Sequence, residues 1–457
     1  MAKQFDIVIL GGGSGGYACA LRASQLGLSV ALIEKDKLGG TCLHRGCIPT
    51  KALLHAAEVA DTARDAGDFG VRADLVGVDL PAVNKYKDSV VNRLYKGLKG
   101  LVKSRDITYV TGEGRLTAPN AVTVAGESYV GRSVVLATGS VPRSLPGLDI
   151  GGRIMTSDQA LELDWIPRSV IVLGGGVIGV EFASVWRSFG SEVTIVEALP
   201  RLVPAEDAAC SKALERAFRK RKIKSLTGVR FAAASQDDTS VTITLEDGTT
   251  LSADLLLVAV GRGPNTASLG YEDQGIAMDR GWVTVDDHLQ TSVPGVYAVG
   301  DIVPGLQLAH RGFAQGIFLA EHLAGLAPQP IDEMGIPRVT YCEPEVASVG
   351  LTQAQAEEQY GADGVVTYEY NLGGNGKSQI LATTGFIKLV QRSDGPVIGI
   401  HMVGSRMGEQ IGEAQLIYNW EALPSDVASL IHAHPTQNEA MGEAHLALAG
   451  KPLHAHS

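Results

Sequence analysis

The chain has 457 residues, of which 45% are hydrophobic and 19% charged, with 55 glycines. This length exceeds what one hydrophobic core serves and predicts roughly three domains of α/β type. The formal net charge of −11 argues against nucleic acid or an anionic membrane as partner. All apolar runs are short or broken by glycines, so we expect no membrane-spanning helix. The first strand begins at Phe5, which leaves no room for an export signal and predicts a cytoplasmic, reducing location.

The first predicted unit is a nucleotide-binding strand–loop–helix. A buried strand at Phe5–Leu10 runs into a loop, and a helix follows at Tyr17–Leu26. The loop supplies glycines at the dinucleotide spacing, Gly11, Gly13 and Gly16. A second strand then ends at Glu34, whose carboxylate can hold ribose hydroxyls while the helix N-terminus receives a pyrophosphate.

Two cysteines, Cys42 and Cys47, follow with Lys51 four positions later. A disulfide between them would close a very short ring and add little stability, so reversible redox chemistry is the favoured function. Two inert buried thiols are the alternative, and a metal site is disfavoured because no second Cys or Cys/His pair has zinc spacing. A helix from about Ile48 to Arg64 would lower the pKa of a thiol at its N-terminus. From local sequence, Lys51 can equally be a solvated surface lysine.

The strand–loop–helix pattern occurs a second time at Arg168–Phe189, after a further amphipathic helix at Asn84–Lys103 and several short strands. Its glycines are Gly174, Gly176 and Gly179. The last motif glycine and the following acid are 18 residues apart in both copies (16 to 34 and 179 to 197). Glu197 favours NAD over NADP, because a 2′-phosphate would need an arginine, although Arg201 keeps NADP open. Glu181, in the second helix, either faces solvent or pairs with Lys51.

The C-terminal third has a different pattern. A strand ends at Asp301, which is either functional or a simple N-cap for the helix at Leu308–Leu326. From about Pro337, short strands alternate with helices and no glycine fingerprint appears, which predicts an antiparallel sheet with helices. In this part His434 precedes Glu439 across a proline turn, and this pair is either structural or a base oriented by its acid. We expect the trailing His445, His454 and His456 to form an untethered tail.

Taken together, these runs resemble the flavoprotein disulfide reductases, the class I pyridine nucleotide-disulfide oxidoreductases, across nearly the whole chain. The resemblance implies an α/β fold with two Rossmann-like domains, for FAD and NAD, and an α+β C-terminal dimerisation domain. The implied domains are FAD-binding at 1–150, NAD-binding at 151–275, the second FAD-binding part at 276–338, and the interface at 339–457.

The same resemblance implies a role for each motif. Cys42 is the interchange thiol, Cys47 lies against the flavin, and His434 with Glu439 is the acid–base pair supplied by the other subunit of an obligate homodimer. Further residues implied at the two cofactors are Gly11, Gly13, Gly16, Glu34, Lys51, Gly114, Asp301 and Ala309 for FAD, Glu181 as the partner of Lys51, and Gly174, Gly176, Gly179, Glu197 and Gly261 for NAD. No metal site is implied.

The implied activity is NAD⁺-dependent oxidation of a protein-bound dihydrolipoyl group. The implied partners are lipoyl domains of 2-oxoacid dehydrogenase complexes or the glycine cleavage H protein. The alternatives are an NAD(P)H-dependent reductase of another disulfide, a metal ion or a quinone, and a flavin-bearing assembly or sensing subunit. The chain departs from the family at His44 and Arg45, between the cysteines, and Arg45 is expected to lower the pKa of the thiols.

Overall fold

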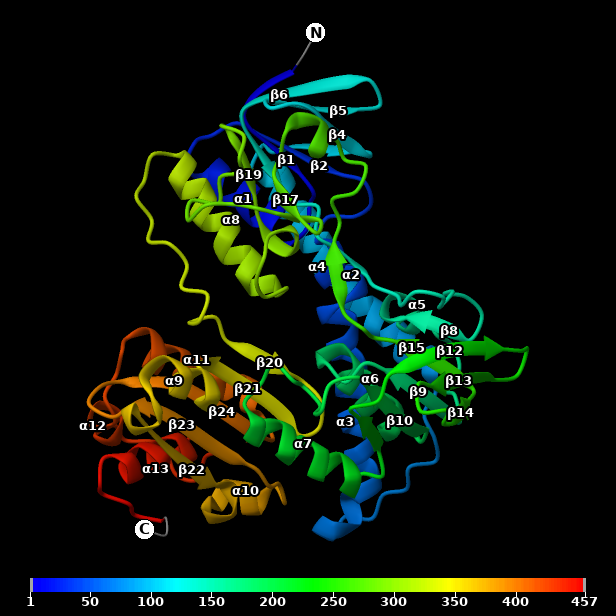
Figure 1. Cartoon of the computed structure of the whole chain (residues 1–457), viewed down its shortest axis with the longest axis vertical. Helices are drawn as coiled ribbons and strands as arrows, with labels where there is room; N and C mark the ends of the chain where they lie inside the picture. The colour runs from blue at the N-terminus through cyan, green and yellow to red at the C-terminus, as the bar shows by residue number, and fades with distance from the viewer. Residues whose placement is uncertain (1–2, 455–457) are drawn as a thin grey trace.

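The computed structural model describes residues 3–454 and contains three sheets of at least five strands, each in its own lobe of the molecule (Figure 1). Two of these sheets are built around parallel strands that flank a glycine loop and its helix, and the third is antiparallel. The predicted combination of two nucleotide-binding α/β units with a C-terminal α+β unit is confirmed.

The first sheet is the upper lobe of Figure 1. Its strands are, in spatial order, β3 (Thr108–Thr111), β2 (Val30–Glu34), β1 (Lys3–Leu10), β6 (Glu127–Leu136), β5 (Ala121–Val124) and β4 (Gly114–Ala118), with β19 (Val296–Ala298) also paired to β6. Since β19 pairs in parallel with β6, the chain returns to the first sheet after completing the second. The helices α1 (Ser14–Gln25) and α8 (Ala309–Leu323) pack together beside this sheet.

The second sheet repeats this plan at the lower right of Figure 1. Its strands are, in spatial order, β11 (Lys224–Thr227), β10 (Glu192–Glu197), β9 (Ser169–Leu173), β15 (Leu255–Val258) and β8 (Ile154–Thr156). Its helices are α5 (Ser157–Ala160), α6 (Val177–Phe189) and α7 (Ala208–Lys220). A separate antiparallel sheet packs against it, formed by β12 (Phe231–Gln236), β13 (Val241–Leu245) and β14 (Thr250–Ala253).

Two short pairs of strands join these parts. They are β7 (Ser140–Pro142) with β16 (Arg262–Pro264), and β17 (Met278–Asp279) with β18 (Trp282–Val283). Domain boundaries near residues 150, 275 and 338 remain our proposal. The assignment of the strands to separate sheets supports them.

The C-terminal sheet is antiparallel throughout, as the sequence pattern predicts. Its strands are, in spatial order, β20 (Arg338–Thr340), β21 (Glu345–Gly350), β24 (Val397–Gly404), β23 (Phe386–Arg392) and β22 (Val365–Asn371). Its helices are α9 (Gln353–Tyr360), α10 (Gly376–Ile380), α11 (Met407–Asn419), α12 (Pro424–Ala428) and α13 (Glu439–Leu448). Sequence reasoning missed β21 and β22.

Three helices link the two nucleotide-binding lobes. They are α2 (Gly40–Arg45), α3 (Cys47–Asp65) and α4 (Leu80–Ser104), and α3 with α4 extends from the upper lobe to the lower right one (Figure 1). Because α3 packs against α6, the segment that follows the redox cysteines contacts the second nucleotide-binding lobe directly.

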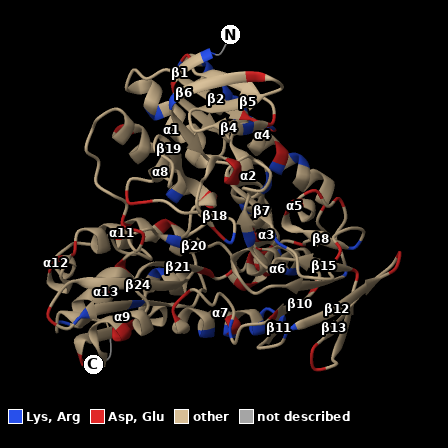
Figure 2. Cartoon of the chain, turned by 45° about the horizontal axis from the view of Figure 1, so that its top comes forward, with Lys and Arg blue, Asp and Glu red and all other residues tan. Residues whose placement is uncertain are grey.

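Within residues 3–454, no helix has the length and apolar character needed to span a bilayer. Figure 2 shows basic and acidic residues interspersed over the lobes.

Candidate redox and dinucleotide sites

The two glycine loops have the same geometry. Gly11 and Gly174 both have φ of +111°, a region in which side-chain-bearing residues are strained. A Cβ at Gly16 would lie 1.9 Å from the carbonyl oxygen of Gly11, and one at Gly179 would lie 1.9 Å from that of Gly174. Only glycine therefore allows each helix to start this close to its strand.

The start of each helix is open to a ligand. Gly13 is the N-cap of α1 and Gly176 is the N-cap of α6, and neither helix has a side-chain cap. A Cβ at Gly176 would meet no protein atom within 4 Å, and one at Gly13 would meet only the Gly40 backbone, at 4.0 Å. Uncapped N–H groups with free space in front of them suit a pyrophosphate, so the residues present fit FAD at the first loop and NAD at the second.

The acid at the end of each second strand is fixed in the same way. Glu34 accepts hydrogen bonds from the backbone N–H of Gly12 at 2.7 Å and Asp36 at 2.8 Å. Glu197 accepts from Gly175 at 2.6 Å and Leu199 at 2.7 Å. Each carboxylate is thereby oriented beside its loop with lone pairs left for ribose hydroxyls.

Arg201, the residue that left NADP possible in place of NAD, already has hydrogen-bond partners within the protein. Its guanidinium donates to the backbone oxygens of Pro204 at 2.9 Å and Glu206 at 3.1 Å. These bonds direct the side chain to its own loop, which favours NAD over NADP.

The two redox cysteines lie at a break between two helices. Cys42 is in α2, and Cys47 is the first residue of α3, with Gly46 between the helices. Both are thiols in the structure, and their sulfur atoms lie near disulfide distance. The predicted helix at Ile48–Arg64 is confirmed as α3, whereas α2 was not foreseen.

The pKa values of the two thiols are shifted in opposite directions. The hydrogen bond from Cys42, together with the Lys51 ammonium and against the effect of burial, lowers the pKa of Cys47 to about 7. The same hydrogen bond, with burial added, raises the pKa of Cys42. In the reduced pair Cys47 therefore carries the negative charge near neutral pH, and Cys42 carries the proton.

Lys51, whose side chain is 33% exposed, and the buried Glu181 form the ion pair that the sequence offered as one of two alternatives. The Lys51 Nζ lies 2.9 and 3.0 Å from the two carboxylate oxygens of Glu181, whose side chain is 3% exposed. Burial opposes the charge on Lys51, but Glu181 outweighs it, and the pKa of Lys51 is raised. The alternatives of a solvated lysine and a solvent-facing glutamate are wrong.

Tyr341 completes this pair and was missed by sequence reasoning. Its ring centroid lies 4.8 Å from the Lys51 Nζ, and its backbone N–H donates to Glu181 at 2.9 Å. Nothing in the local sequence around β20 signals the contact, because it forms only when the C-terminal unit packs against α6.

The remaining predicted cofactor residues surround the first loop and the junction between lobes. Asp301 accepts from Ser140 at 2.6 Å, and its charge contributes to the raised pKa of Cys42. The N-cap of α8 is Leu308, so the alternative of Asp301 as a simple N-cap for this helix is wrong. Ala309 is the first residue of α8, and Gly114, the first of β4, packs against Leu10 at the start of the loop. Gly261, with φ of +103°, has no protein atom near its Cβ position.

The histidine–carboxylate pair predicted from the sequence is present. His434 Nδ1 lies 2.8 Å from Glu439 Oε1, and the other carboxylate oxygen accepts from the Thr436 N–H at 2.7 Å. The His434 side chain is 78% exposed. His434 lies five residues before the start of α13, a helix of the lower left lobe in Figure 1, whereas α2 lies outside that lobe, so this chain by itself does not bring His434 to the cysteines.

Two expectations are corrected. Arg45 forms an ion pair with Asp36, and the neighbouring charges that act on the thiols are Lys51, Asp301 and Glu181, so the expected effect of Arg45 on the thiols is not supported. The expected histidine tail is wrong for two residues. His445 is fully buried in α13, and its Nδ1 donates to the Met441 carbonyl at 2.7 Å, whereas His454 pairs with Glu443 at 2.9 Å. His456 lies outside the described residues.

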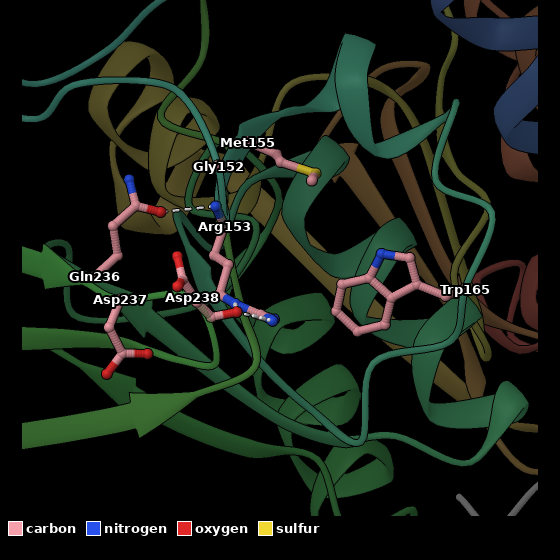
Figure 3. Close-up of a pocket in the computed structure, with 7 residues that line it drawn as sticks. All are labelled: Gly152, Arg153, Met155, Trp165, Gln236, Asp237 and Asp238. Atoms are coloured by element: carbon pink, nitrogen blue, oxygen red, sulfur yellow. Dashed lines mark hydrogen bonds between the residues drawn. The ribbon is translucent and has the colours of Figure 1, made fainter.

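A surface pocket of about 520 Å³ lies beside the second sheet, near β8 and β12 (Figure 3). Its Arg153 side chain lies over the Trp165 ring, 5.6 Å from the centroid, and donates to the Asp238 carbonyl. None of the site residues predicted from the sequence lines it. The pocket is therefore separate from the redox and dinucleotide sites.

Comparison with known proteins identifies a family and relatives that match nearly the whole chain. The family model described as "Pyridine nucleotide-disulphide oxidoreductase" matches residues 5–316, and its "dimerisation domain" model matches residues 336–445. A dihydrolipoyl dehydrogenase of Bacillus subtilis is 41% identical, covering 99% of this chain and 100% of that protein. The mitochondrial dihydrolipoyl dehydrogenase 1 of Arabidopsis thaliana is 39% identical, covering 99% and 92%.

A solved structure agrees with these matches. LpdA of Mycobacterium tuberculosis superposes with a TM-score of 0.90 at 28% identity, covering 98% of this chain and 100% of that one. The family uses FAD and NAD, and its dimerisation domain indicates a homodimer. With a redox cysteine pair, two dinucleotide loops and matches over its full length, the chain belongs to the pyridine nucleotide-disulphide oxidoreductase family and is a flavoprotein disulfide oxidoreductase.

Proposed function

We propose that this protein oxidises a dihydrolipoyl group carried by a partner protein and reduces NAD⁺. The observation that carries the proposal is the Cys42–Cys47 pair with its unequal acidities, next to the Lys51–Glu181 ion pair. Identity of about 40% over full length to proteins named dihydrolipoyl dehydrogenase supports this substrate class over other disulfides.

Thiol–disulfide exchange accounts for the two different cysteines. With the pair oxidised, the substrate thiolate attacks Cys42 Sγ, the Cys42–Cys47 bond breaks, and Cys47 leaves as a thiolate. A pKa near 7 makes Cys47 a good leaving group, and the Lys51 ammonium stabilises its charge. The second substrate thiol then attacks the sulfur bonded to Cys42, which releases the substrate disulfide and leaves both protein sulfurs reduced.

His434 is the base that removes the proton from each substrate thiol. Glu439 holds its Nδ1 side, so Nε2 faces outward and is available as the proton acceptor. Its exposure in the single chain supports a role at the cysteines of the second subunit of the homodimer.

The chain's own residues also define how the cofactors are held. Gly11, Gly13, Gly16 and Glu34 would bind the FAD pyrophosphate and ribose, and their counterparts Gly174, Gly176, Gly179 and Glu197 would bind NAD. FAD supplies the electron transfer between the thiols and the nicotinamide. The protein contributes binding, the charge of Lys51 and the positions of the sulfurs.

We further propose a cytoplasmic location and docking to lipoyl domains of 2-oxoacid dehydrogenase complexes or to the glycine cleavage H protein. Free thiols at Cys19, Cys210 and Cys342 support a reducing compartment. The exposed base supports a substrate that is delivered on another protein.

The first test is turnover by the purified holoenzyme. We expect NADH-linked reduction of lipoamide, and NAD⁺-linked oxidation of dihydrolipoamide, to be much faster than reactions with glutathione disulfide or quinones. Turnover of another disulfide, a metal ion or a quinone with lipoamide inert would instead favour the alternative reductase.

The second test concerns the base. His434→Gln should reduce kcat/KM for dihydrolipoamide by roughly 10²–10⁴-fold, because the substrate proton loses its acceptor. Flavin content and absorption should be unchanged. His55→Gln, in an exposed histidine–glutamate pair on α3, is the matched control and should retain wild-type activity. Loss of flavin in His434→Gln would assign this histidine a structural role.

A further inference from the structure

A second histidine–carboxylate pair lies beside the turn that carries the proposed base, His434. His432 Nε2 lies 2.8 Å from Oε1 of Glu413, which belongs to α11. Unlike His434, this pair is shielded from solvent, with side chains 12% and 22% exposed for His432 and Glu413. Nothing in the thiol–disulfide exchange described above uses these two residues.

Glu413 is bonded to both ends of the turn that carries the base. Its Oε1 meets His432, two residues before His434, and its Oε2 accepts from the side-chain amide of Asn438, the residue before Glu439. One carboxylate therefore connects the segment before the base with the start of the helix that carries its acid.

The His432 ring also packs against α13. A Cβ built on Gly442 would lie 2.6 Å from His432 Nδ1, so the imidazole contacts the backbone face of the helix that begins at Glu439. The ring thus has a fixed place between α11 and α13, and Gly442 is the residue that leaves room for it.

The charged and titratable groups that face His432 are Glu413 from α11 and Glu439 and His445 from α13. The hydrogen bond to Glu413 raises the pKa of His432 against the effect of burial. Burial lowers the pKa of His445 to about 4, so His445 is neutral and does not compete for the proton. Glu439 has a lowered pKa because the Thr436 N–H, His434 and His432 together outweigh burial.

We propose that His432 is a positioning residue: held as an imidazolium by Glu413, it keeps Glu439 ionised and oriented and thereby sets the basicity of His434. The proposal rests on the proposed function only in taking His434 as the base. A cation behind Glu439 offsets part of the carboxylate's charge, which keeps the His434 imidazole from holding its proton too strongly.

The test is the pH dependence of kcat/KM for dithiol oxidation. On the acid side of this profile the rate falls as the base becomes protonated, so the midpoint of this acid limb gives the apparent pKa of the base. His432→Gln removes the cation and leaves Glu413 charged, so the imidazolium form of His434 is stabilised. We expect the acid limb to move up by about half a pH unit. Glu413→Gln lowers the pKa of His432 and removes both charges near neutral pH, so the limb should move in the same direction by less.

Gly442→Ala tests the same idea without removing any polar group. Alanine is a better helix former than glycine, so folding is not at risk from backbone propensity. Its methyl group pushes the His432 ring away from α13 and from Glu439, and the acid limb should again move up. Glu443→Gln is the matched control, because Glu443 is on the same helix and pairs with His454 instead. Its limb should stay at the wild-type pH.

The result that overturns the proposal is an acid limb at the wild-type pH in both His432→Gln and Gly442→Ala, whatever happens to kcat. That outcome would make the pair a purely structural clamp. If His432→Gln does not fold or loses its flavin, the limb of Gly442→Ala alone decides. Each profile is measured with dithiothreitol as well as dihydrolipoamide. If the wild-type enzyme oxidises dithiothreitol but not dihydrolipoamide, the proposed substrate is wrong. The pH profiles of the variants with dithiothreitol then still test the role of His432.

Discussion

At the scale of single residues, the chemistry depends on two identical thiols that behave differently. Cys47 and Cys42 share one hydrogen bond, which stabilises the thiolate of the acceptor and the thiol of the donor. Lys51 adds a positive charge next to Cys47, and Glu181 keeps that lysine ionised although it is partly buried. The ion pair is therefore part of the redox site.

Replacing Lys51 with methionine should raise the pKa of Cys47 by roughly one unit, because the thiolate loses its nearest cation. Since the pKa then lies above neutral pH, the thiolate fraction at pH 7 falls. The measurement is the pH dependence of the alkylation rate of Cys47 by iodoacetamide in the dithiothreitol-reduced holoenzyme. Lys3→Met, which breaks an exposed ion pair with Glu127, should leave the titration unchanged. An unchanged titration in Lys51→Met would mean that Cys42 alone sets the acidity of Cys47.

At the scale of elements, the strand–loop–helix unit is used twice with the same close contacts. In each copy the last motif glycine approaches the carbonyl of the first, so the helix N-terminus reaches the end of the strand. The acid that follows is bonded in each copy to the second glycine of the loop. These matched contacts allow the two nucleotide sites to be tested separately.

Gly179→Ala should weaken NADH binding while flavin binding is retained. The added Cβ would lie 1.9 Å from the Gly174 oxygen, so α6 must shift away from its strand, a strain that costs roughly 1–3 kcal/mol. This corresponds to a rise in the NADH Kd of roughly 5–150-fold, measured by fluorescence titration. Gly16→Ala, the equivalent change in the first copy, should instead reduce flavin content. Equal loss of flavin in both variants would contradict separate sites.

At the scale of the whole molecule, the proposed base, His434, comes just before α13 in the lower left lobe of Figure 1, whereas Cys42 and Cys47 belong to α2 and α3, which link the two nucleotide-binding lobes. The dimerisation domain and the exposure of His434 together support an active site completed by the second subunit. A single chain would then hold every binding residue and still lack a complete site.

A hybrid dimer tests this arrangement. A Cys42→Ser chain and a His434→Gln chain, each inactive in its own homodimer, are coexpressed with different tags and purified as the mixed dimer. If the base serves the partner's cysteines, the mixed dimer has one intact site of two and should show about half of the wild-type activity. An inactive mixed dimer would mean that base and cysteines of the same chain must work together.

The sequence by itself determined the local chemistry. Glycine spacing, the acid after each second strand, the cysteine pair and the His434–Glu439 turn are short-range features, and their backbone geometry follows from the residues within about one strand, loop and helix. The antiparallel C-terminal sheet was also predictable, although β21 and β22 were missed. The apolar run of β21 is diluted by the small residues Ala347 and Ser348, and β22 is an edge strand whose side chains are mostly not buried. The helix α2 was not predicted because a six-residue helix between glycines is too short to show a hydrophobic periodicity.

Only the tertiary structure decided the long-range pairs. Glu181 is buried against Lys51 because α6 packs on α3, and Tyr341 joins them because β20 leads past both; no local pattern encodes such contacts. The same holds for Arg45, which Asp36 draws away from the thiols, and for His445, which is buried where a loose tail was expected. A side chain's charge is known from the sequence, but the group that neutralises it is set by how distant elements pack.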